Sequence, residues 1–193
     1  SDGADDATAP AIGSAELGVV NRGEHVALTF DYHDQGLSER SETTADAATL
    51  QPVSSIIRRE SPQSGPATIT TRYSPAGATP GSSRPVAHIE ITSSRGDESV
   101  TRELPERVYY DADQMLHLLR AMPLKQRFSA TFNALDTLGA SPVSARVRVV
   151  GRETVRVPAG EFDCWRIDVQ GLSMRAWVAV APPSQLVIFE LIP

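Results

Sequence analysis

Histidine and aspartate side chains that could hold a divalent cation share faces of two predicted strands. His25, Asp31 and His33 alternate along one face of the first strand, where Asp31 and His33 would need a third ligand from a neighbouring element. His88 and Glu90 form a similar pair further along the chain. Neither spacing matches an established metal-site pattern, so solvated polar strand faces are the better interpretation. We predict no metal site.

Four carboxylates gather around the start of the one predicted helix, where a pair could act as general acid and base. They are Glu103, Glu106, Asp111 and Asp113. The favourable interaction of acidic residues with a helix N-terminus explains this cluster without a substrate. His117, beside the apolar stripe of the helix, is interpreted as a satisfied or surface histidine. We therefore predict no catalytic residues and no cofactor, and an enzyme with a dispersed site on the histidine face of the first strand is the least favoured alternative.

Two further motifs have simple explanations. Cys164 is the only cysteine, which rules out an intrachain disulfide and a cysteine-rich zinc site. It lies in a predicted strand with no histidine adjacent in sequence, so we interpret it as a small, partly buried strand residue. Arg95-Gly96-Asp97 falls in a predicted hairpin turn, and turn chemistry accounts for its glycine and aspartate.

Composition narrows the class of partner. The chain has 193 residues and a net charge of −6, which disfavours nucleic acids and anionic membranes as partners. No apolar run reaches the roughly 18 residues of a transmembrane segment. Residues 1–15 are predicted to be a flexible acidic tail and residues 16–193 a single domain. A removed signal peptide would explain the start without Met, so we expect a periplasmic or secreted protein, with a lipid anchor on the trimmed N-terminus as one alternative.

Alternating apolar and polar residues predict that the domain is mainly β. The clearest strands are Glu24–Asp34, Val143–Val157 and Glu161–Val169, the last two joined by the turn Pro158-Ala159-Gly160. Ser41–Asp46 is more polar and is predicted to be an edge-like strand. We expect about nine to ten strands in one strongly curved antiparallel sheet or half-barrel.

One segment has helical periodicity. Asp111 and Gln114 form a capping-box pattern, and apolar residues recur at helical spacing until Pro123 ends the run. The predicted helix, Ala112–Met122, should lay this stripe on the concave face of the sheet. The residues of the stripe are Met115, Leu118, Leu119 and Met122.

Two segments resemble a known family. Leu104–Leu124 is similar to the middle of an uncharacterised bacterial exported family, domain of unknown function 3108. Val147–Arg166, with its Gly-x-Glu and Pro-Ala-Gly motifs, resembles the C-terminal signature of that family, and Ala176-Trp177-Val178 is similar to its final strand pair. Such families are similar in fold to the periplasmic lipoprotein carriers LolA and LolB. The resemblance implies an incomplete barrel, closed by helical segments over an apolar cavity.

These observations lead to two main hypotheses for function. The first is a non-catalytic exported domain that binds an apolar ligand, such as an acyl chain or a lipoprotein, in the half-barrel. The candidate cavity residues are Met115, Leu118, Leu119, Met122, Val147, Val149, Trp165 and Ile167. If the helix plugs the barrel, the same side chains are simply core. The second hypothesis is a structural or interaction module of a cell-envelope assembly, which pairs with an envelope protein through the predicted edge strand Ser41–Asp46.

Overall fold

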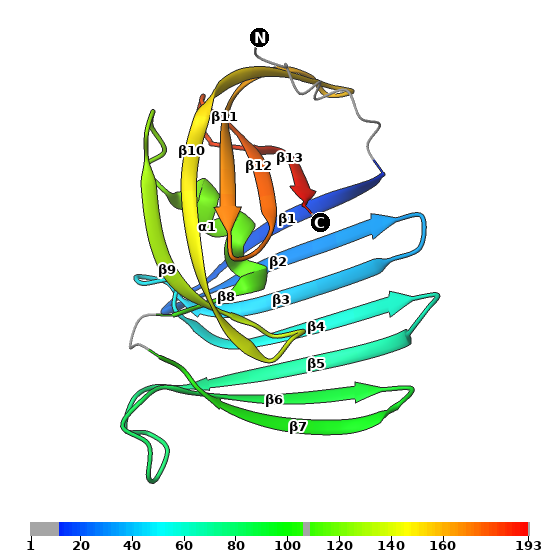
Figure 1. The fold of residues 1–193 in the computed structure, drawn as a ribbon, viewed down its shortest axis with the longest axis vertical. Helices are drawn as coiled ribbons and strands as arrows, with labels where there is room; N and C mark the ends of the chain where they lie inside the picture. The colour runs from blue at the N-terminus through cyan, green and yellow to red at the C-terminus, as the bar shows by residue number, and fades with distance from the viewer. Residues whose placement is uncertain (1–11, 106–108, 193) are drawn as a thin grey trace.

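The computed structural model describes residues 12–105 and 109–192, which form two sheets with one helix between them (Figure 1). The first sheet is a seven-stranded antiparallel meander in which each strand pairs with the next along the chain. Its strands are β1 (Gly13–Arg22), β2 (His25–Asp34), β3 (Ser38–Asp46), β4 (Pro52–Ser61), β5 (Gly65–Ser74), β6 (Val86–Ser93) and β7 (Gly96–Glu103).

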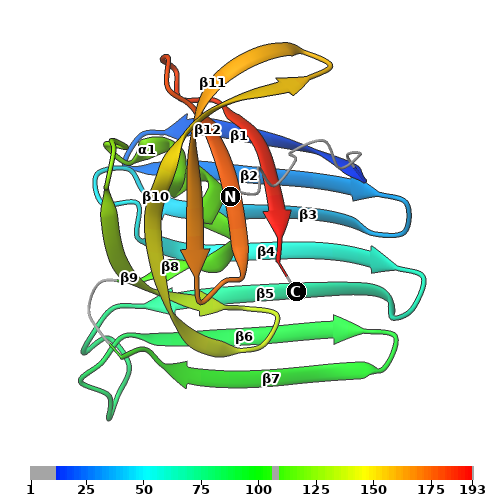
Figure 2. The ribbon, with the colours of Figure 1, turned by 45° about the horizontal axis from the view of Figure 1, so that its top comes forward.

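The second sheet has six strands in the order β13-β12-β11-β10-β9-β8. All its pairs are antiparallel except β8 with β9, which is parallel. Both views show its strands running across those of the first sheet (Figures 1 and 2). Its strands are β8 (Tyr110–Asp111), β9 (Ser129–Asp136), β10 (Ser141–Val157), β11 (Gly160–Gln170), β12 (Met174–Ala179) and β13 (Leu186–Leu191).

The described residues thus hold thirteen strands in two sheets, which corrects the expectation of nine to ten strands in one sheet. The mainly β class and the curled antiparallel architecture with one helix are confirmed. Strand β1 was not predicted from the sequence, because it is an edge strand in which no residue is buried. Its first residues, Gly13–Ala15, were assigned to the tail, and residues 1–11 of that tail lie outside the described residues.

Strand β3 contains the predicted edge strand Ser41–Asp46, and here the prediction is wrong. The strand lies between β2 and β4 and pairs with both along nearly its whole length. The prediction took the polar residues of this strand as a sign of exposure. Ser41 and Thr43 are small enough to be buried, each at 2% exposure, in the interior of the sheet. The edges belong to β1 and β7 in the first sheet and to β13 and β8 in the second.

The alternation in β10 is confirmed and shows which side of the second sheet is buried. Ala145, Val147 and Val149 are buried, whereas Arg146 and Arg148 between them are exposed. We call the side with the buried residues the inner face, because there the sheet packs against the helix.

A β-bulge between Val149 and Gly151 reverses this alternation. The extra residue in β10 exchanges the faces of every residue after it. Val155 is therefore buried on the outer face of the sheet, in a small cluster with Cys164 and Trp177.

The helical segment consists of a 3-10 turn, η1 (Ala112–Gln114), followed by α1 (Met115–Ala121). The predicted capping box at its start, formed by Asp111 and Gln114, is confirmed. The apolar stripe packs on the inner face of the second sheet, where Met115 and Leu119 meet β10, β11 and β12. The largest buried cluster therefore lies between the helix and the second sheet, and a second one is centred on β4, β5 and β6 of the first sheet.

Candidate ligand-binding cavity

The eight side chains predicted to line a cavity lie together in or beside the core. Met115, Leu119, Val147, Val149 and Ile167 belong to one buried cluster, and Met122 and Trp165 pack against it half-buried. Leu118 is also buried, at 5% exposure. All eight thus occupy packed positions, and Met115 is the one among them that also lines the cavity described next.

That cavity, of about 410 Å³, lies beside the start of the helix, between the first sheet and the turns of the second. Strands β2, β3 and β4 form one wall, and η1 with the beginning of α1 forms another. The β9–β10 turn, the β11–β12 turn and β13 complete it. Its apolar lining consists of Phe30, Tyr32, Leu37, Ala112, Met115, Leu116, Leu138, Val143, Leu172, Met174, Phe189 and Leu191.

Three aromatic rings join the two sheets at this cavity. Phe30 and Tyr32, both on β2, are parallel with ring centroids 6.1 Å apart. Phe189 on β13 meets both rings edge-on, at 6.0 Å from Phe30 and 5.8 Å from Tyr32. Edge-to-face pairs of this kind fix the geometry of the wall as well as burying apolar area.

The cavity reaches the surface, because two of its lining residues are strongly exposed. Leu138 in the β9–β10 turn is 44% exposed, and Leu191 at the end of β13 is 73% exposed. The cavity is therefore open to solvent beside these two residues.

One side of the lining is charged and predominantly acidic. Glu39 on β3, Asp113 in η1 and Asp136 on β9 contribute carboxyl groups, and Arg59 on β4 contributes the only guanidinium. Arg59 Nε lies 3.7 Å from Glu39 Oε2. Burial raises the pKa of Glu39, and Arg59 opposes that change.

The Asp113 carboxyl group lacks a hydrogen-bond partner for one of its two oxygen atoms among the described residues. Its Oδ2 atom is covered by protein and has no hydrogen-bond partner among the described residues. Burial, followed by the negative charges of Asp111, Glu39 and Asp136, raises the pKa of Asp113 well above its ordinary value, and only Arg59 acts in the opposite direction.

In Asp111, by contrast, both carboxyl oxygens accept hydrogen bonds from the protein. Its Oδ2 accepts a hydrogen bond from the Tyr73 hydroxyl at 2.6 Å, and its Oδ1 accepts one from the Asp113 backbone N–H at 3.1 Å. Gln114 completes the capping box and donates to the Leu50 carbonyl at 3.1 Å. These contacts attach the start of the helix to the first sheet, so this part of the acidic cluster is structural. Glu103 accepts a hydrogen bond from Ser82 at 2.8 Å, and Glu106 lies outside the described residues.

His117 is a buried histidine held by the first sheet. Because a carbonyl oxygen only accepts, the 3.0 Å contact shows that Nε2 donates to the carbonyl of Thr29 on β2. Its Nδ1 is buried without a partner among the described residues. Burial lowers the pKa of His117, and Arg120 adds to this effect. The neutral ring thus serves packing.

The candidate metal ligands are dispersed. His33 Nε2 lies 2.7 Å from Asp31 Oδ1, but His25 is six residues before Asp31 on the same strand, or about 20 Å away at the usual rise per residue. His88 contacts Thr101 Oγ1 at 3.0 Å, and Glu90 lies 3.4 Å from Arg72. No group of three or more metal-ligating side chains occurs within residues 12–105 and 109–192.

Cys164 is completely buried rather than partly buried, on the outer face of the second sheet beside Trp177. Burial, with smaller contributions from Asp163 and Glu153, raises its pKa to about 11. The group is therefore a thiol at neutral pH and is not an activated nucleophile.

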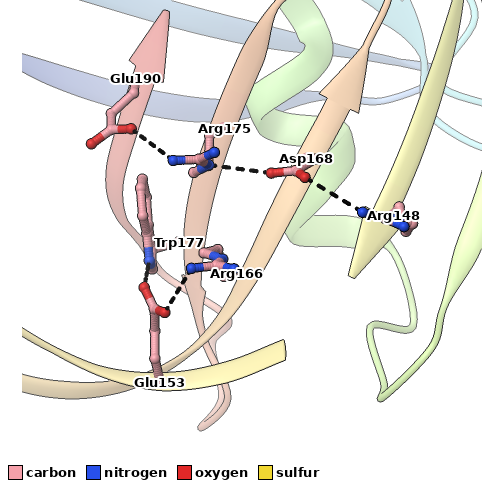
Figure 3. A network of polar contacts seen from close by, with 7 residues as sticks. All are labelled: Arg148, Glu153, Arg166, Asp168, Arg175, Trp177 and Glu190. Atoms are coloured by element: carbon pink, nitrogen blue, oxygen red, sulfur yellow. Dashed lines mark hydrogen bonds and ion pairs between the residues drawn. The ribbon is translucent and has the colours of Figure 1, made fainter. Parts of the chain in front are cut away.

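The outer face of the second sheet carries a row of alternating charges (Figure 3). Arg148, Asp168, Arg175 and Glu190 occupy paired positions on β10, β11, β12 and β13, with ion-pair distances of 3.9, 3.2 and 3.7 Å. Glu153, beyond the β-bulge, accepts a hydrogen bond from the Trp177 indole and pairs with Arg166. These contacts bind the strands to one another and face away from the cavity.

Sequence reasoning missed most of the cavity lining. Phe30 and Tyr32 had a signal, because both fall on the apolar face of the first predicted strand. No sequence pattern indicated that Phe189, the β9–β10 turn or the β11–β12 turn lines a cavity, because their positions follow from how the second sheet lies across the first. Arg95-Gly96-Asp97 lies at the β6–β7 turn, as predicted, and the positive φ of Gly96, 120°, suits that turn.

Comparisons with known proteins address the family. No curated protein matches the chain. A solved crystal structure of a DUF1089 family protein from Pseudomonas aeruginosa is similar, with a TM-score of 0.40 and 13% identity over 94% of this chain and 91% of that one. Residues 12–190 match the family described as a protein of unknown function, DUF3108. Because this match spans nearly the whole chain, the protein belongs to the DUF3108 family.

Proposed function

We propose that this protein is a non-catalytic binding domain that takes an apolar ligand into the cavity between its two sheets. The observation that carries the proposal is the cavity of about 410 Å³ with its aromatic and aliphatic walls. Its volume falls within the range of about 300–1,000 Å³ that is typical of small-molecule sites. An acyl chain or the lipid part of a lipoprotein has the required apolar character.

The proposed site differs from the one expected around the helical stripe. Leu119, Val147 and Ile167 are at 0% exposure in the core, so a ligand there would have to displace packed side chains. The cavity beside Met115 and Leu116 is already open and requires no such displacement. We also propose a periplasmic or secreted location, which the resemblance to exported carriers supports. No helix among the described residues is long and apolar enough to cross a membrane.

Titration with octanol, a small neutral apolar probe, tests the proposal by calorimetry. The variant Ala112→Trp places a large ring at a half-buried position that lines the cavity. Ala159→Trp, in the exposed β10–β11 turn, is the matched control. We expect octanol to bind the wild type and the control alike, and to bind Ala112→Trp at least about tenfold more weakly.

An unfolding midpoint for each variant establishes that the fold is intact. If octanol does not bind the wild type, or if folded Ala112→Trp binds it as well as Ala159→Trp does, the proposed function is wrong.

A further inference from the structure

The cavity combines an apolar body with an acidic end. Its three carboxyl groups, on Glu39, Asp113 and Asp136, face a single guanidinium, on Arg59. Charged groups lining a pocket that excludes much of the water interact more strongly with a ligand than they would in bulk water. This lining should therefore discriminate between ligands by the sign of their charge.

The one cationic side chain of the lining already lies beside a carboxylate of the protein. Arg59 Nε lies 3.7 Å from Glu39 Oε2, and the Glu39 side chain is only 12% exposed. A fatty-acid carboxylate would compete with Glu39 for this guanidinium and would approach Asp113 and Asp136 as well. Like charges brought together in such surroundings oppose binding.

Asp113 supplies an unused acceptor at the same end. Its covered Oδ2 has no hydrogen-bond partner among the described residues, and leaving a buried acceptor without a donor is unfavourable. The raised pKa of Asp113, caused first by burial, agrees with this lack of a positive or donating partner. A ligand ammonium group would supply both the charge and the hydrogen-bond donors that Asp113 lacks.

We propose, resting on the function proposed above, that the ligand is a cationic amphiphile: an apolar chain that carries an amine, with the amine at the Asp113 end of the cavity. The chain occupies the aromatic wall formed by Phe30, Tyr32 and Phe189. The ammonium group lies among the carboxyl groups of Asp113, Asp136 and Glu39. Free fatty acids are then poor ligands in spite of an equally apolar chain.

Three probes with the same chain separate the effects of charge and apolarity. Octylamine, octanol and octanoate are titrated into the wild-type protein at pH 7 by calorimetry, at low and at physiological salt. Asp113→Asn keeps the shape of the side chain and removes the carboxylate, the form of Asp113 that a bound ammonium group would stabilise. Asp97→Asn, at the exposed start of β7, removes the same charge far from the cavity and controls for the general attraction of an amine to a protein of net charge −6.

We expect octylamine to bind at least about tenfold more tightly than octanoate, with octanol between them. Asp113→Asn should weaken octylamine binding about three- to tenfold and change octanol binding less than about twofold, whereas Asp97→Asn should change neither beyond about twofold. Octanoate binding as tightly as octylamine, or an equal effect of the two variants, would overturn this inference alone. Failure of octanol to bind would overturn the proposed function and the inference with it.

Discussion

Replacing Tyr73 with phenylalanine tests how the start of the helix is held on the first sheet. The change removes one hydroxyl, which donates to Asp111 Oδ2 at 2.6 Å, and leaves the ring stacked on Tyr109 at 5.5 Å. Hydrogen bonds to charged groups contribute about 1.5–3 kcal/mol. Asp111 is at 0% exposure, but it keeps the donor of the Asp113 backbone. We therefore expect a loss of about 2 kcal/mol, below the 3–5 kcal/mol of a fully unpaired buried charge.

Urea denaturation at pH 7 measures this loss as a lower midpoint at an unchanged slope. Tyr110→Phe is the matched control, because Tyr110 neighbours Asp111 and its ring packs edge-on against Phe132 at 5.6 Å. The structure shows no hydrogen bond from its hydroxyl within the described residues, so the control should stay within about 0.5 kcal/mol of the wild type. A Tyr73→Phe loss below about 0.5 kcal/mol, or an equal loss in the control, would refute the proposed attachment.

Three further predictions concern charge. Asp113→Asn should raise the free energy of unfolding at pH 7, because the raised pKa of Asp113 means that folding favours its protonated form. The gain should vanish below the ordinary aspartate pKa of about 3.9, where the side chain is protonated in both states. Urea denaturation at a series of pH values measures this change. The lowered pKa of His117 means that folding favours its neutral ring, so wild-type stability should fall as pH drops below about 6.5, and His117→Gln should flatten that slope. Arg175→Ala removes contacts to two carboxylates and should cost about 1–2 kcal/mol at low salt, less at high salt, whereas Arg148→Ala, with one contact at 3.9 Å, should cost less than about 0.5 kcal/mol.

Local patterns predicted the individual elements well. The capping box at Asp111 and Gln114 and the alternation through Val147 and Val149 are both local signals, read from residues two to four apart, and the structure confirms both. The helical stripe likewise lies on the inner face of a sheet, as its spacing required.

No local sequence pattern indicated that the strands divide into two sheets. Alternation along β2 shows that Phe30 and Tyr32 share an apolar face, but it does not show that Phe189, near the other end of the chain, covers that face. Placing the cavity at the helical stripe followed from assuming one sheet. The charge of the cavity was hidden for the same reason, because Glu39, Asp113 and Asp136 converge only when both sheets are in place.

The methionine methyl groups give the most direct test of the cavity. The chain has three methionines, of which Met115 and Met174 line the cavity and Met122 packs against the core at the end of the same helix as Met115. In a spectrum of protein with ¹³C-labelled methionine methyl groups, saturating octanol should shift the signals of Met115 and Met174 and leave that of Met122 in place. An unchanged spectrum, or a shift of Met122 as large as the other two, would contradict a ligand site between the two sheets.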